Sequence, residues 1–468
     1  MKPLHILLLI TFFSIASCKK ETFITSSNAR LTTSADTLRF DTLFTSVGSV
    51  TQYFRIFNDN DQKLKLSNIQ LKGGLNSAFK INVDGFIGPE VRDVEVEAND
   101  SVYVFVTVKI DPTASDIPFV FQDSVQIDYN GNTKWVQLEA WGQNANFFRS
   151  RVITGTESWT NAKPYVILDG LFIAAGATLI INKGTKIFVH ADAPIIVDGT
   201  LRAMGEQYDS TRITFRGDRL DEPYRNFPAA WPGIFFRETS VNNQLSFVNI
   251  RNAYQGIVLL QPSVNSNPKL ILSESVIDNC FDAGILSIGS SLVARNNLVS
   301  NCGKNLVLVN GGDYNFNHCS VVSISNNFIS HKEPVLLLSN FIQEGSTVVS
   351  SPLSASFTNC IFWGENGTVE DEVTINQQPA APLGVDFQNC LWKVKKDPGL
   401  TAGVTSAGIV ANQDPVFDSI NVQRNYYNFR LRDGSPAINK GLATPLFSDL
   451  DGNPRPVGLP DMGSYEKQ

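Results

Sequence analysis

The chain has 468 residues, with 38 Lys and Arg against 45 Asp and Glu, which gives a net charge of −7. Charged residues make up only 18% of the chain, which excludes intrinsic disorder, a coiled coil and a highly charged nucleic-acid binder. A net negative charge gives no attraction to nucleic acid or to anionic lipid, although a local basic groove could still bind an acidic glycan. The 33 Gly and 31 Phe against three Met favour strands and turns, so we expect an all-β protein.

The first residues carry the features of an export signal. Lys2 supplies a positive charge, and residues 6–15 form an apolar stretch too short to span a bilayer. The stretch ends in Ile15-Ala16-Ser17-Cys18, which resembles the lipobox of bacterial lipoproteins. The resemblance implies cleavage after residue 17 and attachment of acyl chains, palmitate among them, at Cys18. The alternative is an ordinary signal peptide with an incidental cysteine.

This reading predicts the location and the anchor of the protein. Residues 1–17 would be the signal peptide, and Ser/Thr-rich residues 18–33 would be a flexible tether. We expect a lipid-anchored protein of the bacterial cell envelope, at the outer membrane, whose membrane contact is the lipid at Cys18. No nucleic-acid partner is expected.

Five further cysteines lie within one stretch of the chain, at positions 280, 302, 319, 360 and 390. Four of them follow an Asn and the fifth follows His318, which indicates a repeated structural position. An odd number cannot pair completely, and no close Cys pair has the spacing of zinc ligands. We therefore expect buried free thiols that pack as small apolar side chains, with a disulfide framework as the alternative.

Residues 34–145 alternate polar and apolar side chains with the period of two that is typical of half-buried strands. "QYFRIF" and "VYVFVTV" are examples, and turn clusters such as Asn130-Gly131 separate the strands. Short strands at this spacing predict a β-sandwich. The segments "VEVEANDSVYVFVTVKIDP" and "FQDSVQIDYNG" resemble Ig-like modules of the abnormal-spindle and sperm-protein type, which implies a structural or binding role.

From about residue 150 to 430, short apolar segments alternate with Gly, Asn and Asp. Asn279 and Asn301 are 22 residues apart, and repeats of this length with short strands predict a solenoid. "IIVDGTLRAMG", "RITFRGD" and "WPGIFF" resemble the opening turns of right-handed parallel β-helix proteins of the pectin-lyase superfamily. A single register does not fit all repeats, because "FTNCIFWG" and "FQNCLWK" align with "FNHCSVVS" better than with "VIDNCFDA". The alternative fold is a β-propeller.

Residues 431–468 resemble the choice-of-anchor Q-type segment that ends many bacterial β-helix proteins, on the motifs "GSPAINKG" and "DLDGNPRPVGLPDMGSYE". Such a segment suits a C-terminal cap that covers the open end of a solenoid. Arg455 with Asp449, Asp451 and Asp461 suggests a buried ion network. A Ca²⁺ loop built from the same aspartates is the alternative, and otherwise no cofactor or metal is expected.

Members of the pectin-lyase superfamily include polysaccharide lyases and glycoside hydrolases, so a catalytic site must be considered. The hydrolase motifs Asn-Thr-Asp, Asp-Asp, Gly-His-Gly and Arg-Ile-Lys are absent from this sequence. The remaining catalytic candidates are Asp278 and Asp282, with Arg295 or Lys304 on neighbouring turns, and His190 with Asp192. Turn residues of a solenoid account equally for all of them.

Aromatic side chains give the sequence its clearest candidate binding surface. Tyr224, Phe227 and Trp231 lie in the Pro-rich segment "LDEPYRNFPAAWPG", and aromatic rings serve sugar or protein recognition. Anchoring of the loop onto the coil is the alternative. Together these features predict a non-catalytic surface scaffold or adhesin-like binder of a glycan or surface protein. The alternative is a polysaccharide lyase or glycoside hydrolase with a nonstandard site.

Overall fold

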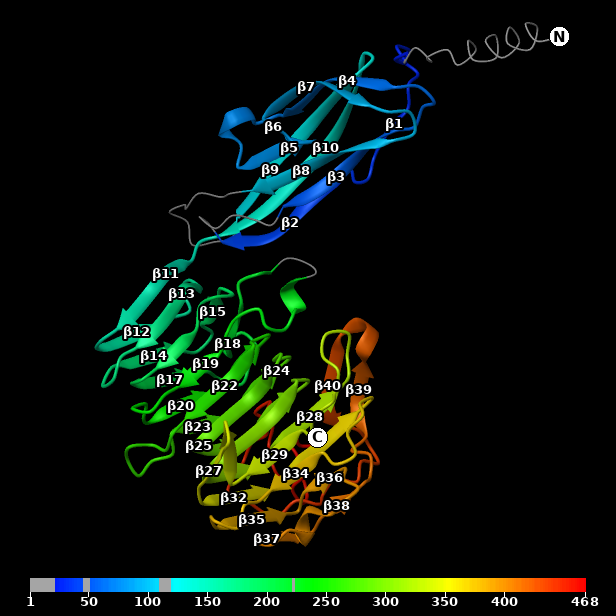
Figure 1. Ribbon diagram of the computed structural model, residues 1–468. Helices are drawn as coiled ribbons and strands as arrows, with labels where there is room; N and C mark the ends of the chain where they lie inside the picture. The colour runs from blue at the N-terminus through cyan, green and yellow to red at the C-terminus, as the bar shows by residue number, and fades with distance from the viewer. Residues whose placement is uncertain (1–21, 45–50, 109–118, 221–223) are drawn as a thin grey trace, which may run out of the picture. The chain divides into compact units, whose positions relative to one another are not determined.

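The computed structural model describes residues 22–44, 51–108, 119–220 and 224–468 (Figure 1). The chain divides into two compact units, Met1–Asn144 and Ala145–Gln468. Within the described residues all regular structure is β-strand, apart from four short 3-10 turns. In this part of the chain no helix is long and apolar enough to cross a membrane. Cys18 and the predicted signal peptide lie outside the described residues.

The first unit is a sandwich of two five-stranded sheets. One sheet has the order β1 (Leu31–Thr33), β3 (Gln52–Asn58), β8 (Ser101–Val108), β5 (Phe79–Val83) and β6 (Phe86–Ile87). The other has the order β2 (Thr37–Phe44), β10 (Asn132–Gln143), β9 (Phe119–Tyr129), β4 (Leu64–Leu71) and β7 (Glu90–Val96). The predicted alternation is confirmed, since Phe54 and Ile56 on β3 and Val104 on β8 are completely buried. The Ig-like sandwich is therefore present as expected.

The predicted flexible tether is wrong for its described part, because residues 22–33 belong to the sandwich. Ile24 N donates to Lys63 O at 2.9 Å, and Asn130 Nδ2 donates to Ile24 O at 2.9 Å. Ala29 is 6% exposed. Ser26 Oγ accepts from Asn28 N, and the abundance of Ser and Thr in this stretch gave no sign of the few apolar residues that dock.

The second unit is a parallel β-helix whose turns each contribute strands to three columns, and this confirms the predicted solenoid. The first column contains part of β11 (Asn146–Ile153) and part of β13 (Tyr165–Ile173), β16 (Ile195–Val197), β19 (Ile234–Phe236), β22 (Gln255–Leu260), the first halves of β25 (Ala283–Arg295) and β27 (Lys304–Asn317), β29 (Leu336–Ser339) and β34 (Val373–Asn376). The second contains β12 (Thr156–Trp159), β14 (Thr178–Asn182), β17 (Thr200–Met204), β20 (Asn243–Ser246), β23 (Leu270–Ser273), the second halves of β25 and β27, β32 (Leu353–Thr358), β35 (Leu383–Gln388) and β37 (Val404–Ala407). The third contains the remaining parts of β11 and β13, β15 (Lys186–Val189), β18 (Ile213–Gly217), β21 (Val248–Arg251), β24 (Val276–Asp278), β26 (Leu298–Ser300), β28 (Ser320–Ile324), β33 (Ile361–Glu365), β36 (Leu391–Trp392) and β38 (Val410–Ala411).

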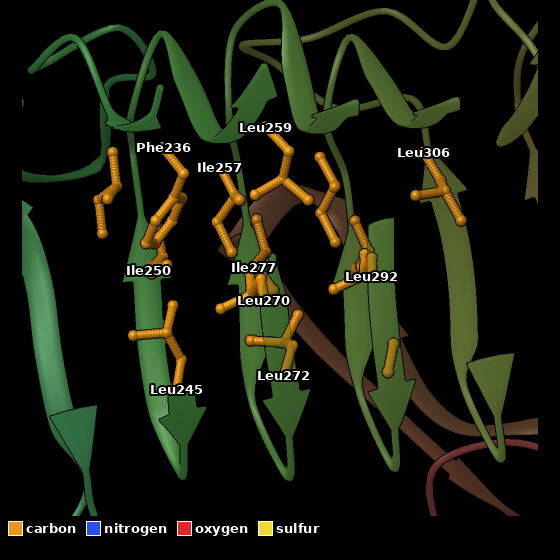
Figure 2. Packing of buried hydrophobic residues seen from close by; sticks show 14 of the residues in the cluster. Phe236, Leu245, Ile250, Ile257, Leu259, Leu270, Leu272, Ile277, Leu292 and Leu306 are labelled. Atoms are coloured by element: carbon orange, nitrogen blue, oxygen red, sulfur yellow. The ribbon is translucent and has the colours of Figure 1, made fainter. Parts of the chain in front are cut away.

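The register explains why these short apolar segments form a stable coil. Ile257 of β22, Ile285 of β25 and Leu306 of β27 are paired neighbours in the first column, and all three are completely buried. Figure 2 shows such side chains from successive turns directed into one continuous core. Each fully buried aliphatic side chain contributes about 1.5–3 kcal/mol, so a strand of three to five residues suffices when its neighbours repeat the pattern.

The cysteines occupy two different corners of the coil, which is why one register could not fit the sequence. Cys280 and Cys302 follow the left-handed residues Asn279 and Asn301, at the ends of third-column strands. The other three follow left-handed residues at the corner between the second and third columns, namely His318, Asn359 and Asn389. All five thiols are buried and free, which confirms the prediction.

The C-terminal segment, residues 432–468, covers a side of the coil, whereas a cap over its end was expected. It follows the hairpin of β39 (Phe417–Asn421) and β40 (Tyr426–Leu431), so the coil already ends at β38, before the predicted residue 430. Corner amides on three turns donate to backbone carbonyls of the segment: Asn389 to Lys440, Asn359 to Leu442 and Asn296 to Ser448. The segment buries outward-facing apolar side chains of the third column, including Leu298, Val322, Ile324, Ile361 and Leu391. Leaving these exposed would create an apolar patch, which explains the lateral position.

Candidate binding cleft

One outward-facing row of the third column carries four polar side chains on successive turns. The register pairs Arg251 with Asp278 and Asp278 with Ser300. Phe215 pairs with Ile250, so Arg216 lies at the same level as Arg251. Because successive residues of a strand point to opposite faces, the buried Phe215 and Ile250 direct their neighbours outward. The row ends where the C-terminal segment covers Val322.

A ladder of asparagines lies beside this row, at the adjacent corner. Asn252, Asn279 and Asn301 have φ values of 62°, 56° and 52°, a conformation that Asn tolerates better than other non-glycine residues. Asn279 Nδ2 donates to Asn252 Oδ1 at 3.0 Å and to Asn226 O at 2.9 Å. The amides thus hold the turns in register and tie down the loop around Asn226.

Three loops surround this floor and enclose a cavity of about 120 Å³. Asn226 comes from the 3-10 turn Tyr224–Asn226, Asn326 follows β28, and Asn425 and Tyr427 come from the β39–β40 hairpin. A neighbouring cavity of about 290 Å³ shares four residues with it: Arg251, Asp278, Asn425 and Tyr427. We call the joint site the Arg–Asn cleft and define it by Arg216, Arg251, Asn252, Asp278, Asn279, Asn301 and Tyr427.

The electrostatics of the cleft are dominated by arginine. Arg216 Nη2 donates to Arg225 O at 2.7 Å, while its buried Nε has no hydrogen-bond partner among the described residues. Burial lowers the pKa of Arg216, and the positive charges of Arg225 and Arg251 lower it further. Guanidinium groups that are crowded in this way favour an anionic ligand.

Asp278 is the one carboxylate among the residues that line the two cavities. Its Oδ1 accepts from Ser300 Oγ at 2.7 Å and from Asn301 Nδ2 at 3.5 Å. Burial raises the pKa of Tyr427 to about 12, with a further contribution from Asp278. Tyr427 therefore stays protonated near neutral pH.

Two of the three predicted aromatic binding residues lie next to the cleft. Tyr224 and Phe227 are 42% and 38% exposed and flank Asn226, with ring centroids 5.3 Å apart. The expectation for Trp231 is wrong: its side chain is completely buried and its Nε1 donates to Arg251 O at 2.9 Å. Trp231 lies three residues before β19 and belongs to the core of the coil, a role that the Pro-rich setting concealed.

The three weak catalytic candidates lie in separate surroundings. Asp278 is in the cleft, whereas Asp282 accepts from Gln255 Nε2 at 2.7 Å and pairs with Lys304 Nζ at 3.2 Å. Asp282 lines neither cavity of the cleft.

His190 pairs through Nδ1 with Asp218 Oδ2 at 2.7 Å, where Asp192 had been the expected partner. Burial raises the pKa of Asp218, and its bond to His190 opposes the rise. Arg295, the other suggested partner, pairs with Glu274 at 3.5 Å. The expected acid–base groupings around Asp278 and His190 are therefore not formed.

The C-terminal aspartates satisfy backbone groups. Asp449 Oδ1 accepts from the amides of Asp451 and Asn453, and Asp461 Oδ1 accepts from Asn439 N. Arg455 pairs with Glu466 at 2.9 Å, both completely buried, so the predicted ion network exists around a different carboxylate. Within the described ranges no three His, Cys, Asp or Glu side chains gather as metal ligands would.

Sequence reasoning did not bring Arg216, Arg251 and Tyr427 together in one site. The two arginines share a sequence pattern that could have found them. Arg216 in "TFRGD" and Arg251 in "NIRNA" each occupy the same position before a corner of the coil. Tyr427 is brought to the cleft by the lateral path of the C-terminal chain, which no local pattern specifies.

No protein-family model and no curated protein matches the chain. Solved structures with weak similarity include a family 123 glycoside hydrolase from Clostridium perfringens, described for glycolipid glycan hydrolysis, at 11% identity and a TM-score of 0.18. The alignment covers 26% of each chain, so this chain matches about a quarter of the hydrolase's length.

Two further structures match parts of the chain. The ASH/PapD-like domain 7 of human CEP192 is 13% identical over 27% of this chain and 92% of that domain, with a TM-score of 0.18. The Dettilon tailspike protein is 9% identical over 58% of this chain and 62% of its own, with a TM-score of 0.23. The chain consists of an Ig-like β-sandwich followed by a parallel β-helix. The β-helix carries a cleft that is lined by arginine and asparagine side chains.

Proposed function

We propose that this protein is a lipid-anchored, non-catalytic binder of glycans on the bacterial cell envelope, at the outer membrane, and that it binds them in the Arg–Asn cleft. The single observation that carries the proposal is the convergence of two arginines, three corner asparagines and Tyr427 on one cavity. The lipid at Cys18 would be its membrane contact, and a surface protein is the alternative partner.

The chemistry of the cleft suits a glycan that carries carboxylate or sulfate groups. Guanidinium groups bind such anions in a planar, two-pronged geometry, and the amides supply paired donors and acceptors for hydroxyl groups. The exposed rings of Tyr224 and Phe227 offer apolar faces beside it. The local positive charge offsets the net charge of −7 that would otherwise repel an acidic ligand.

The same residues argue against cleavage. Hydrolysis uses two carboxylates that flank the scissile bond, and Asp278 is alone in the lining of the cleft. A general base works best when its pKa lies near the working pH, and burial raises the pKa of Tyr427 away from that range, to about 12. The alternative is a lyase with a nonstandard site, in which the arginines neutralise the uronate and Asp278 removes the proton.

A glycan array that contains acidic and neutral oligosaccharides tests the proposal with the full mature chain. Arg251→Gln should weaken binding of acidic glycans at least tenfold, because a hydrogen bond to a charged group is worth about 1.5–3 kcal/mol. Arg202→Gln is the matched control, because Arg202 is exposed on β17 and does not line the cleft. Equal loss in both variants, or no binding of acidic glycans by the native chain, would refute the proposal.

A further inference from the structure

The outer face of the first column carries a continuous row of apolar side chains. The register joins them on successive turns, from Val152 to Leu337. Their strand neighbours Ile257, Ile285 and Leu306 are completely buried, so the alternation of a strand directs the row outward. We call it the apolar row and define it by its two ends and the residues between them in the register, Phe172, Ile196, Phe235, Val258, Leu286 and Val307.

A shorter apolar row lies beside it, two residues further along the same strands. Leu260 pairs with Ile288 and Ile288 with Val309, and all three are half-buried. At ~4.8 Å per turn and ~3.3 Å per residue, the outer face of the first column is on the order of 35 Å long and 15 Å wide.

The other two columns show how the chain treats an outer face of each kind. On the third column, the apolar residues Leu298, Ile361 and Leu391 pack under the C-terminal segment. On the second column the outer row is largely polar and includes Arg202, Gln244, Asn315, Ser356 and Asp386. In the part of the chain that the structure describes, none of the three clusters of buried apolar side chains includes a member of the apolar row. The first column is therefore apolar outside and without the kind of cover that the third column has among the described residues.

We propose that the apolar row is the centre of an interface between two copies of this chain, which pack face to face with their coils antiparallel. Sheet faces pack about 10 Å apart with interdigitated side chains. A two-fold axis along the strands brings the same face of each copy together, as a closed homodimer requires. The face offers on the order of 500 Å² per copy, so the pair buries about the 1,000 Å² that a specific interface needs.

The order of side-chain sizes along the row favours the antiparallel arrangement. The first turn of the row in one copy then meets the last turn in the other. Phe172 faces the partner's Val307 and Phe235 faces the partner's Val258, so each large ring meets a small side chain. Parallel coils would place each phenylalanine against its own equivalent and each valine against its own, which packs less densely.

Ion pairs at the two ends of the first-column strands suit a protein partner. Asp198 pairs with Arg237 after the strands, and Asp282 pairs with Lys304 at 3.2 Å before them. An apolar centre with a polar rim is typical of protein–protein interfaces. Because each of these cations is paired with a carboxylate, the rim suits an anionic lipid surface less well.

Sedimentation of residues 19–468, produced without the lipid, tests the inference. The native chain should be dimeric at micromolar concentration. Leu286→Asp should raise the dissociation constant of the dimer at least tenfold, because it buries an unpaired charge in each half of the interface. Val293→Asp is the matched control, since Val293 lies on the same strand, β25, on the outer face of the second column and is 36% exposed. Circular dichroism and thermal melting establish that both variants are folded.

Cysteine cross-linking tests the arrangement with smaller changes to the chain. Val152→Cys and Leu337→Cys lie at opposite ends of the apolar row, and the five native thiols of the coil are buried. In a mixture of the two variants, a short bis-maleimide should link one variant to the other. It should link neither variant to itself, because equivalent positions lie far apart in an antiparallel pair.

The dimer is independent of the proposed glycan site, since the Arg–Asn cleft shares no residue with the apolar row. Arg251→Gln should therefore leave dimerisation unchanged. A native chain that stays monomeric up to ~100 µM would overturn the inference, as would equal dissociation by Leu286→Asp and Val293→Asp or links within a single cysteine variant. Binding of a monomeric native chain to phosphatidylethanolamine–phosphatidylglycerol vesicles that Leu286→Asp abolishes would also overturn it, and would assign the row to a membrane.

Discussion

His318 is the one titratable imidazole among the corner residues between the second and third columns. It has a φ of 52° and takes the place that Asn296, Asn359 and Asn389 take on other turns. The ring is completely buried, and Asn359 Nδ2 lies 2.8 Å from its Nε2. Burial lowers the pKa of His318 to about 3, and the positive charge of Arg455 contributes.

This histidine should make the protein less stable in acid. Between pH 6.5 and about 3 the unfolded chain binds a proton that the folded chain does not, so stability falls as pH drops through this range. His318→Asn keeps the corner conformation and removes the titration. The native protein should lose about 2–3 kcal/mol more than the variant between pH 7.5 and 4.5. Urea unfolding at both pH values measures this, and equal losses would contradict it.

Asn279 joins the floor of the Arg–Asn cleft to the turn before it. Asn279→Leu removes its two bonds, to Asn252 Oδ1 and Asn226 O, and leaves both acceptors unpaired. The free energy of unfolding should fall by about 1–3 kcal/mol. Asn376→Leu, at an exposed strand position, is the control. Chemical denaturation would contradict this account if both variants lost the same stability.

At the scale of elements, the sequence predicts what repeats and does not predict where an irregular segment lies. The Asn-Cys pairs indicate stacked turns correctly, yet Asn279 and Asn359 stand at different corners that use the same chemistry, a left-handed Asn followed by a small inward side chain. Local pattern cannot separate them, because only the strand lengths between corners differ.

The sequences of the strands that the C-terminal segment covers already indicated its lateral position. In "SVVSI" of β28 the apolar residues Val321 and Val322 are adjacent and all five residues are buried, which is typical of a strand covered on both faces. The arginines of the cleft likewise share a position before a corner. Tyr427 and the hairpin could not be predicted, since their place depends on long-range packing.

Arg455 fastens the C-terminal segment to the coil. Its Nε pairs with Glu466 at 2.9 Å and its Nη1 donates to Asn296 Oδ1 at 2.7 Å. Arg455→Met would leave the Glu466 carboxylate buried without its partner, at a cost of about 3–5 kcal/mol. Arg432→Met, exposed in the same segment, should cost little. Thermal unfolding compares the two, and similar melting temperatures would show that the ion pair does not hold the segment.

At the scale of the whole molecule, the proposed lipid anchor would fix where the proposed binding site acts. Phe23 already pairs with Lys63 of the sandwich, so few residues separate Cys18 from the folded unit. Lipidation would therefore hold the sandwich close to the bilayer. Cys18→Ala should release the protein from membranes or block its processing, as fractionation and mass spectrometry of the N-terminus would show. A variant that is cleaved normally and stays membrane-bound would exclude the lipoprotein.

The central claim is that the Arg–Asn cleft binds an acidic glycan and leaves it intact. It is tested most directly by calorimetric titration of the best acidic array ligand, with the same sample assayed for new reducing ends and unsaturated uronates. The account predicts saturable binding without products, and loss of binding in an Arg216→Gln, Arg251→Gln double variant. Product formation that Asp278→Asn abolishes would contradict it and identify a lyase or hydrolase.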